Sequence, residues 1–84
     1  MVAVSNQTTQ LKMVKIMNDF DKGVFYVAGL LVTFMDSPGY AVDVLEQAGL
    51  LNADISSLDE TEQRAMKTLM KDGNKRVNLT GLTI

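Results

Sequence analysis

The sequence predicts a small all-α unit of three to four helices, and two observations point to it. Along most of the chain, apolar residues recur at spacings of three and four, which places their side chains on one face of a helix. Residues that typically end or begin helices separate these stretches, including the only proline of the chain. With 84 residues the chain is a single domain, residues 1–84. A chain of this length buries only about 60–65% of its unfolded surface, so we expect an oligomer in which a second chain completes the core.

The first predicted helix covers residues 8–35 and is long or broken. Thr8 or Thr9 can cap its start. Without a break it would span about 40 Å, whereas a compact globule of this size is roughly 30 Å across. We therefore expect either a kink or break near Gly23, or a second chain that covers the protruding end.

Apolar residues of this first segment alternate between spacings of four and three, as in the seam of a coiled coil. We expect this seam to mediate self-association. Between positions 24 and 35 nearly every residue is apolar, so the pattern is more specific in the first half of the segment. The predicted self-association residues are Met13, Met17, Phe20, Val24, Val27, Leu31 and Phe34.

A second helix is predicted over residues 37–48. Ser37 suits the N-cap, and Pro38 suits the first helical position because its missing N–H has no partner there in any helix. Gly49, followed by a leucine, is typical of a left-handed helix end.

A third helix is predicted over residues 57–72, because Ser57 and Glu60 form the pattern of a capping box. The remaining residues, 74–84, include apolar side chains without helical order. We expect them to form an extended tail that packs on the helices or on a neighbouring chain.

The composition excludes most catalytic chemistry. The chain has no Cys and no His, so it lacks a thiolate nucleophile, an imidazole base and the commonest zinc ligands. The segment from Asp19 to Gly23 fails as a calcium loop, because the glycine falls at the fifth position instead of the sixth. We therefore expect a protein that is not an enzyme and that has no cofactor and no metal site.

The location of the protein is predicted from two further absences. The N-terminal residues have neither the basic start nor the apolar centre of a signal peptide. The longest uncharged stretch, residues 23–35, is shorter than the roughly 20 residues that a membrane span requires. The sequence therefore predicts a cytoplasmic protein without membrane contact.

Charges are segregated along the chain. Residues 23–63 contain seven carboxylates and neither Lys nor Arg, whereas the two ends together carry +5, which gives the formal net charge of −2. Five of the basic residues lie close together near the C-terminus and are candidates for anion or partner binding. These are Arg64, Lys67, Lys71, Lys75 and Arg76.

Two interpretations of this basic cluster remain open. Acidic residues at the start of the third helix and lysines toward its end complement the helix dipole, which requires no ligand. Alternatively, the cluster is a basic stripe that binds a nucleotide, a nucleic acid or an acidic protein.

A helix-turn-helix is a second alternative, since the apolar residues and the glycine between positions 44 and 58 have the spacing of such a unit. Its recognition helix would be residues 52–58, which carry Asp54 and no basic residue. Because phosphates provide most of the affinity for DNA, this acidic segment argues against DNA binding.

Together, these features favour a small helical protein that self-associates and binds a protein partner, as a regulator, an inhibitor or an assembly subunit. An anion-binding module for a nucleotide or nucleic acid is the first alternative, and a DNA-binding regulator of the helix-turn-helix type is the second.

Overall fold

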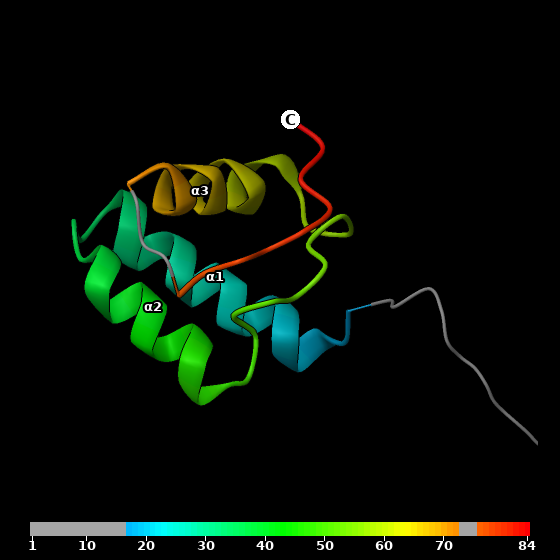
Figure 1. Ribbon diagram of the computed structural model, residues 1–84, viewed down its shortest axis with the longest axis horizontal. Coiled ribbons are helices and arrows are strands. Elements are labelled where there is room, and N and C mark those ends of the chain that lie inside the picture. Colours follow the sequence, from blue (N-terminus) through cyan, green and yellow to red (C-terminus); the bar gives the residue numbers. More distant parts are fainter. Residues whose placement is uncertain (1–16, 73–75) are drawn as a thin grey trace, which may run out of the picture.

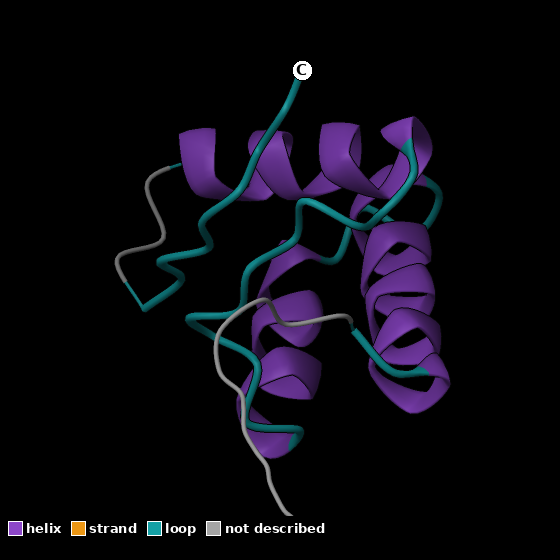
Figure 2. Ribbon diagram, turned by 90° about the vertical axis from the view of Figure 1, so that its right-hand side faces the viewer, coloured by secondary structure: helices purple, strands orange, loops and turns teal. Residues whose placement is uncertain are grey.

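Three helices make up the part of the chain that the computed structural model describes, residues 17–72 and 76–84. They are α1 (Asp19–Thr33), α2 (Pro38–Gln47) and α3 (Glu60–Lys71). Helices α1 and α2 lie side by side and run in opposite directions, and α3 runs crosswise to them (Figures 1 and 2). Helix α1 packs against both of the others. The all-α class is confirmed for the described residues, which contain no strand.

Helix α1 begins later than the sequence pattern predicts. Asn18 is its N-cap, with an extended backbone and a side-chain oxygen that accepts a hydrogen bond from the Asp21 N–H at 2.8 Å. An uninterrupted helix over residues 8–35 is not confirmed, because Met17 and Asn18 are not helical and α1 ends at Thr33. Thr8, Thr9 and the rest of the predicted first half lie outside the described residues. Of the two expected alternatives, a break near Gly23 does not occur, since α1 continues through that residue.

Local signals account well for helix α2. Asp36, with a φ of 48°, reverses the chain after α1, and Pro38 then occupies the first helical turn. At the other end, Gly49 has a φ of 73°. Its N–H donates to the Glu46 carbonyl while the Leu50 N–H donates to the Leu45 carbonyl, a pair of hydrogen bonds that defines the Schellman motif.

Helix α3 begins at Glu60, three residues after the predicted start. Its N-cap is Asp59, whose carboxylate accepts a hydrogen bond from the Glu62 N–H. The predicted capping box at Ser57 is therefore wrong. A carboxylate stabilises the positive end of a helix dipole better than a hydroxyl, which favours the later start.

The core lies between α1 and the other two helices. Phe25 and Ala28 of α1 are fully buried, together with side chains from α2, α3 and the connecting segment. The buried apolar residues are Met17, Phe25, Ala28, Ala41, Val42, Leu45, Ile55, Leu58, Ala65, Met66, Leu69, Val77 and Leu79.

The C-terminal segment 76–84 contains no helix and runs beside the connection between α2 and α3. Backbone hydrogen bonds join the two: the Thr80 N–H donates to the Ala53 carbonyl, and the Ile55 N–H donates to the Thr80 carbonyl. They produce an isolated parallel bridge between Asp54 and Thr80. The tail thus closes one side of the core, where Val77 is buried.

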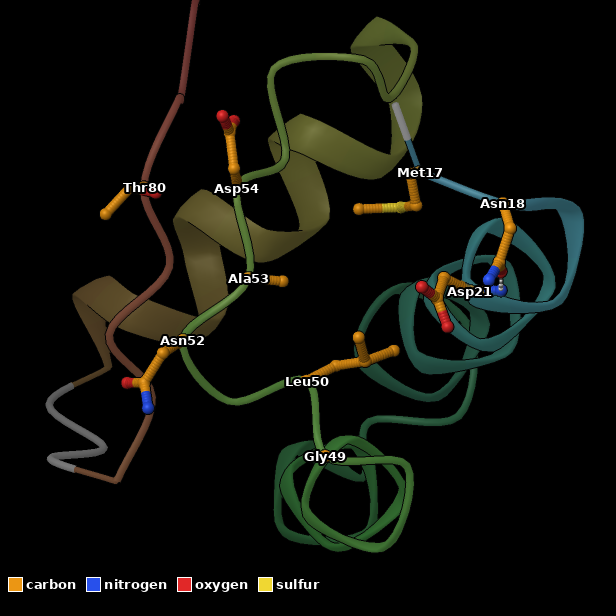
Figure 3. A pocket seen from close by; sticks show the side chains of 9 residues that line it. All are labelled: Met17, Asn18, Asp21, Gly49, Leu50, Asn52, Ala53, Asp54 and Thr80. Atoms are coloured by element: carbon orange, nitrogen blue, oxygen red, sulfur yellow. Dashed lines mark hydrogen bonds between the residues drawn. The ribbon is translucent and has the colours of Figure 1, made fainter. Parts of the chain in front are cut away.

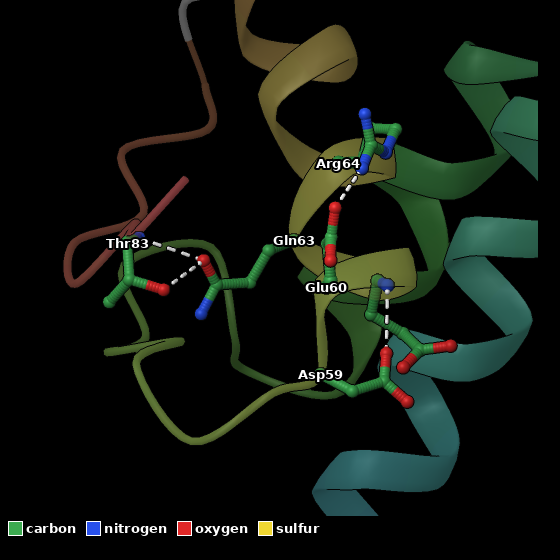
Figure 4. Close-up of polar contacts among 6 residues, drawn as sticks. Asp59, Glu60, Gln63, Arg64 and Thr83 are labelled. Atoms are coloured by element: carbon green, nitrogen blue, oxygen red, sulfur yellow. Dashed lines mark hydrogen bonds and ion pairs between the residues drawn. The ribbon is translucent and has the colours of Figure 1, made fainter.

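Gln63 ties this tail to α3 (Figure 4). Its side chain is only 1% exposed. The amide nitrogen donates to the carbonyls of Ile55 and Leu58, at 3.0 and 3.3 Å. The amide oxygen accepts from the backbone N–H and the hydroxyl of Thr83, at 2.8 and 2.9 Å. All the polar atoms of this buried side chain are therefore paired, as burial requires.

Candidate functional site

The most unusual surface of the molecule is the outer face of α1. A helix that covers a core on one side normally carries polar residues on the other, but α1 has no charged residue between Gly23 and Val32. At 3.6 residues per turn, the side of α1 opposite its buried residues is a stripe about 80° wide. We call this stripe the α1 face; it consists of Phe20, Gly23, Val27, Leu30 and Phe34.

Large side chains of the α1 face are open to solvent. Phe20 is 71% exposed, Val27 47% and Phe34 78%. Isolated exposed apolar residues are ordinary, but a contiguous apolar patch on a small protein is typical of an interaction surface. Tyr26, Met35 and Tyr40 are also exposed and lie on α1, at its end, or on the adjacent α2.

The structure divides the predicted self-association residues into separate groups. Phe20, Val27 and Phe34 lie on the α1 face, at successive spacings of seven. Met17 belongs to the buried core, and Val24 and Leu31 are half-buried and pack against the core. Met13 lies outside the described residues. Some residues of the predicted seam therefore pack in or against the core. The others, on the α1 face, form an exposed ridge.

Two shallow apolar grooves border this ridge. Phe20 and Val24 of α1, together with Tyr40 and Val44 of α2, line the groove between these two helices. On the other side, the groove between α1 and α3 includes Phe34. The α1 face thus has the shape of a ridge with a groove on each flank.

A more polar pocket of about 600 Å³ lies where α1 begins, next to the bridge between the tail and the connecting segment (Figure 3). Two of its polar side chains already form hydrogen bonds within the turns around it. Asn18 caps α1, and the carboxylate of Asp54 accepts a hydrogen bond from the Ser56 N–H at 2.9 Å. This hydrogen bond lowers the pKa of Asp54. An acid with a lowered pKa is a poor proton donor or acceptor near pH 7, so the pocket does not favour acid–base catalysis.

Asp59 and Glu62 form a coupled acidic pair at the start of α3. The hydrogen bond with the Asp59 side chain, partial burial and the nearby Asp59 charge raise the pKa of Glu62 from 4.5 to about 7. The hydrogen bonds with Glu62 in turn lower the pKa of Asp59. Glu62 also lines the groove between α1 and α3, which places a proton-binding group beside the α1 face.

The predicted anion-binding residues do not form one open stripe. Arg64 makes an ion pair with Glu60 one turn earlier in α3 (Figure 4). Arg76 reaches α2 and contacts Asp43 at 3.2 Å and Glu46 at 2.7 Å.

Two of the three lysines of the predicted set lie in the described part of the chain. Lys67 and Lys71 are exposed on α3, and Lys75 lies outside the described residues. Both described arginines of the set are therefore engaged with carboxylates of their own chain, which weakens the case for a phosphate ligand.

The recognition helix that a helix-turn-helix requires does not form. Residues 52–58 are turns and an isolated bridge. Hydrogen bonds to the tail hold this segment, such as that of the Ile55 N–H with the Thr80 carbonyl at 2.8 Å. The apolar residues that have the spacing of this motif instead pack the connecting segment against the core.

Some features of the described residues could not be predicted from sequence spacing. Only the packing of the helices shows that Tyr40 and Tyr26 line the grooves on the two sides of the α1 face. Met35 is exposed at the end of α1. Within residues 17–72 and 76–84, no three acidic, His or Cys side chains gather in a group that can hold a metal ion. None of the helices described is both long enough and apolar enough to cross a membrane.

Comparison of the chain with protein-family models, with curated proteins and with solved structures found no match. Any functional inference therefore rests on the residues and their arrangement.

Proposed function

We propose that this chain is a non-enzymatic protein-interaction module that binds another protein chain through the α1 face. One observation carries the proposal: a ridge of exposed apolar side chains, with Phe20, Val27 and Phe34 seven residues apart, follows a helix that is otherwise part of the core. Covering such a ridge removes apolar surface from water, which is the main driving force of protein association.

The ridge also has the composition of a binding surface. Interfaces are enriched in aromatic residues and methionine and depleted of charged residues at their centre. Phe20 and Phe34 stand near the two ends of α1, and the nearest charged side chains of the helix, Asp19, Asp21 and Lys22, all lie in its first turn. A partner can therefore cover the centre of the ridge without burying a charge.

Binding of an anion through the basic cluster is less well supported. Arg64 and Arg76 already contact carboxylates, and the segment 36–62 adds acidic residues to the same small molecule. These charges would repel a polyanion.

Site-specific photo-crosslinking in the native cell tests the proposal. A photoreactive amino acid replaces Val27 in one variant and Thr68, an exposed residue of α3, in a control variant. We expect the Val27 variant to form covalent adducts with protein on irradiation and the Thr68 variant to form none. Absence of adducts from the Val27 variant contradicts the proposed function, as does an equal yield from the two positions.

A further inference from the structure

We propose that the partner on the α1 face is a second copy of this chain, and that the two α1 helices pack antiparallel with Val27 of each copy at the two-fold axis. This inference rests on the proposed function, because it names the partner that covers the same surface. The antiparallel pair is one of several arrangements that a protein-binding ridge allows.

The exposed apolar area suits a dimer of modest size. An aromatic side chain presents about 150–250 Å², and the aromatic residues that border α1 are between 56% and 78% exposed. Together these side chains offer about 500 Å² of apolar surface. A standard interface buries roughly 800 Å² on each partner, so these side chains alone supply more than half of a contact of that size. The four aromatic residues are Phe20, Tyr26, Phe34 and Tyr40.

The ridge is self-complementary about its centre. Val27 lies midway between Phe20 and Phe34, so a two-fold axis at Val27 places Phe20 beside the partner's Phe34, and the same contact repeats on the other side. The grooves on both flanks of α1 provide space for the large side chains of the opposite ridge.

Gly23 provides a second, independent observation. It lies in the interior of α1 and on the α1 face, and a Cβ atom added to it would meet nothing within 4 Å. Glycine destabilises a helix interior, and no contact within the described part of the chain requires it here. In the proposed pair, the absence of a side chain at Gly23 lets the two helices approach closely.

The helix dipoles favour the antiparallel orientation. Asp19 and Asp21 lie in the first turn of α1, and Asp36 follows its last turn. A parallel pair would bring both acidic ends together and align the two helix dipoles side by side. An antiparallel pair separates the two Phe20 positions, and the acidic residues beside them, by about 21 Å.

Cysteine crosslinking tests this arrangement, because the natural chain contains no cysteine. Four single variants of the full chain are oxidised under mild conditions: Val27→Cys, Phe20→Cys, Phe34→Cys and the control Thr68→Cys. All four positions are exposed, so the substitutions leave the core intact. Circular dichroism verifies that each variant is folded.

Only Val27→Cys is expected to form a disulfide dimer rapidly. At about 100 μM protein its crosslinking should be roughly 10-fold faster than that of Thr68→Cys, because a formed dimer holds the two thiols at an effective concentration of about 1 mM. Phe20→Cys and Phe34→Cys should each react as slowly as the control.

The possible results separate this inference from the proposed function. Fast crosslinking of all three single α1 variants shows a parallel pair and overturns the antiparallel arrangement. Slow crosslinking of Val27→Cys overturns the second copy as the occupant. In that case, photo-adducts of the Val27 position with a different protein would keep the proposed function, and their absence would remove both.

Discussion

Among single side chains, Gln63 has the greatest influence on how the tail is held. It is buried, and its amide links the connecting segment, through Ile55 and Leu58, to Thr83 in the tail. Replacing it by leucine would remove these hydrogen bonds, although the Ile55 carbonyl would keep a second donor, the Leu58 N–H. A buried polar group left without its partner costs about 1–3 kcal/mol.

We expect Gln63→Leu to lower the free energy of unfolding by roughly 2–4 kcal/mol. The matched variant Thr83→Val removes only the hydroxyl bond and should cost about 1 kcal/mol. Urea denaturation followed by circular dichroism measures both. Equal effects of the two substitutions would show that Gln63 does not organise the tail.

Gly81 is the glycine with the strictest requirement in the described chain. Its φ is +81°, and a Cβ atom would overlap the Asp54 carboxylate and lie 2.9 Å from the Ser56 nitrogen. Gly49 also has a positive φ, but open space surrounds its Cβ position. Alanine at a left-handed position costs about 1–2 kcal/mol from backbone strain alone.

We therefore expect Gly49→Ala to cost about 1–2 kcal/mol of the free energy of unfolding, and Gly81→Ala to cost about 1–3 kcal/mol more, because crowding adds to strain. Thermal denaturation of the two variants gives the comparison. A smaller loss for Gly81→Ala than for Gly49→Ala would contradict the close approach of the tail to the segment around Asp54.

The acidic pair at the start of α3 predicts a pH dependence of stability. Because the pKa of Glu62 is raised from 4.5 to about 7 in the folded chain, the folded state binds this proton more tightly than the unfolded state. The stabilising contribution is therefore complete below pH 4.5 and is lost as the pH rises through 7. Asp59, whose pKa is lowered, changes its charge at a lower pH than this window.

A Glu62→Gln variant cannot ionise, so it should be more stable than the natural chain at pH 8 and of similar stability at pH 5. Urea denaturation at the two pH values tests this expectation. The same difference in stability at pH 5 and pH 8 would show that the Glu62 carboxyl is not the titrating group.

At the level of the helices, α1 contains a glycine that no contact within the described part of the chain requires. Gly23 lies in its interior, where the backbone of a glycine loses more freedom on folding than that of an alanine. Since open space surrounds its Cβ position, alanine at this position has no steric penalty within the described part of the chain.

Gly23→Ala is thus expected to raise the free energy of unfolding by about 0.5–1 kcal/mol, measured by urea denaturation at low micromolar protein, where a weak dimer is dissociated. A loss of stability would mean that α1 needs the conformational freedom of glycine there, contrary to its regular helical structure.

Helix α2 could be predicted almost to the residue, because its boundaries depend on neighbours in the sequence. Pro38 favours the first turn, and Gly49 adopts the left-handed conformation that ends the helix. The start of α1 was not predicted, although Asn18 and the acidic residues that follow it are typical of a helix N-terminus. The apolar spacing that extends back to Met13 instead favours an earlier start.

The orientation of α1 could not be predicted from periodicity. Nearly every residue between positions 24 and 32 is apolar, so no polar residue marks the outer side, and the sequence is equally compatible with several core faces. Only the packing of α2 and α3 buries Phe25 and leaves Val27 exposed. The contacts of Gln63 and Arg76 join segments far apart in the sequence, which local patterns do not reveal.

For the chain as a whole, the formal charge of −2 includes opposite charges that form ion pairs with one another. Arg76 joins the tail to two carboxylates of α2, and Arg64 joins a carboxylate of its own helix. Exposed ion pairs of this kind contribute little to stability, typically 0–1 kcal/mol each. Their consequence is rather that these arginines and carboxylates neutralise one another locally, and the most distinctive surface of the described chain is the apolar α1 face.

Sedimentation equilibrium of the full chain, from about 1 μM to 1 mM, tests most directly whether the α1 face is covered by a second copy. The weight-average mass should rise from the 9.2 kDa of the monomer toward twice that value. The folded variant Phe34→Ser should remain a monomer over the same range. A mass of 9.2 kDa for the natural chain at every concentration would contradict the proposal that a second copy covers the α1 face.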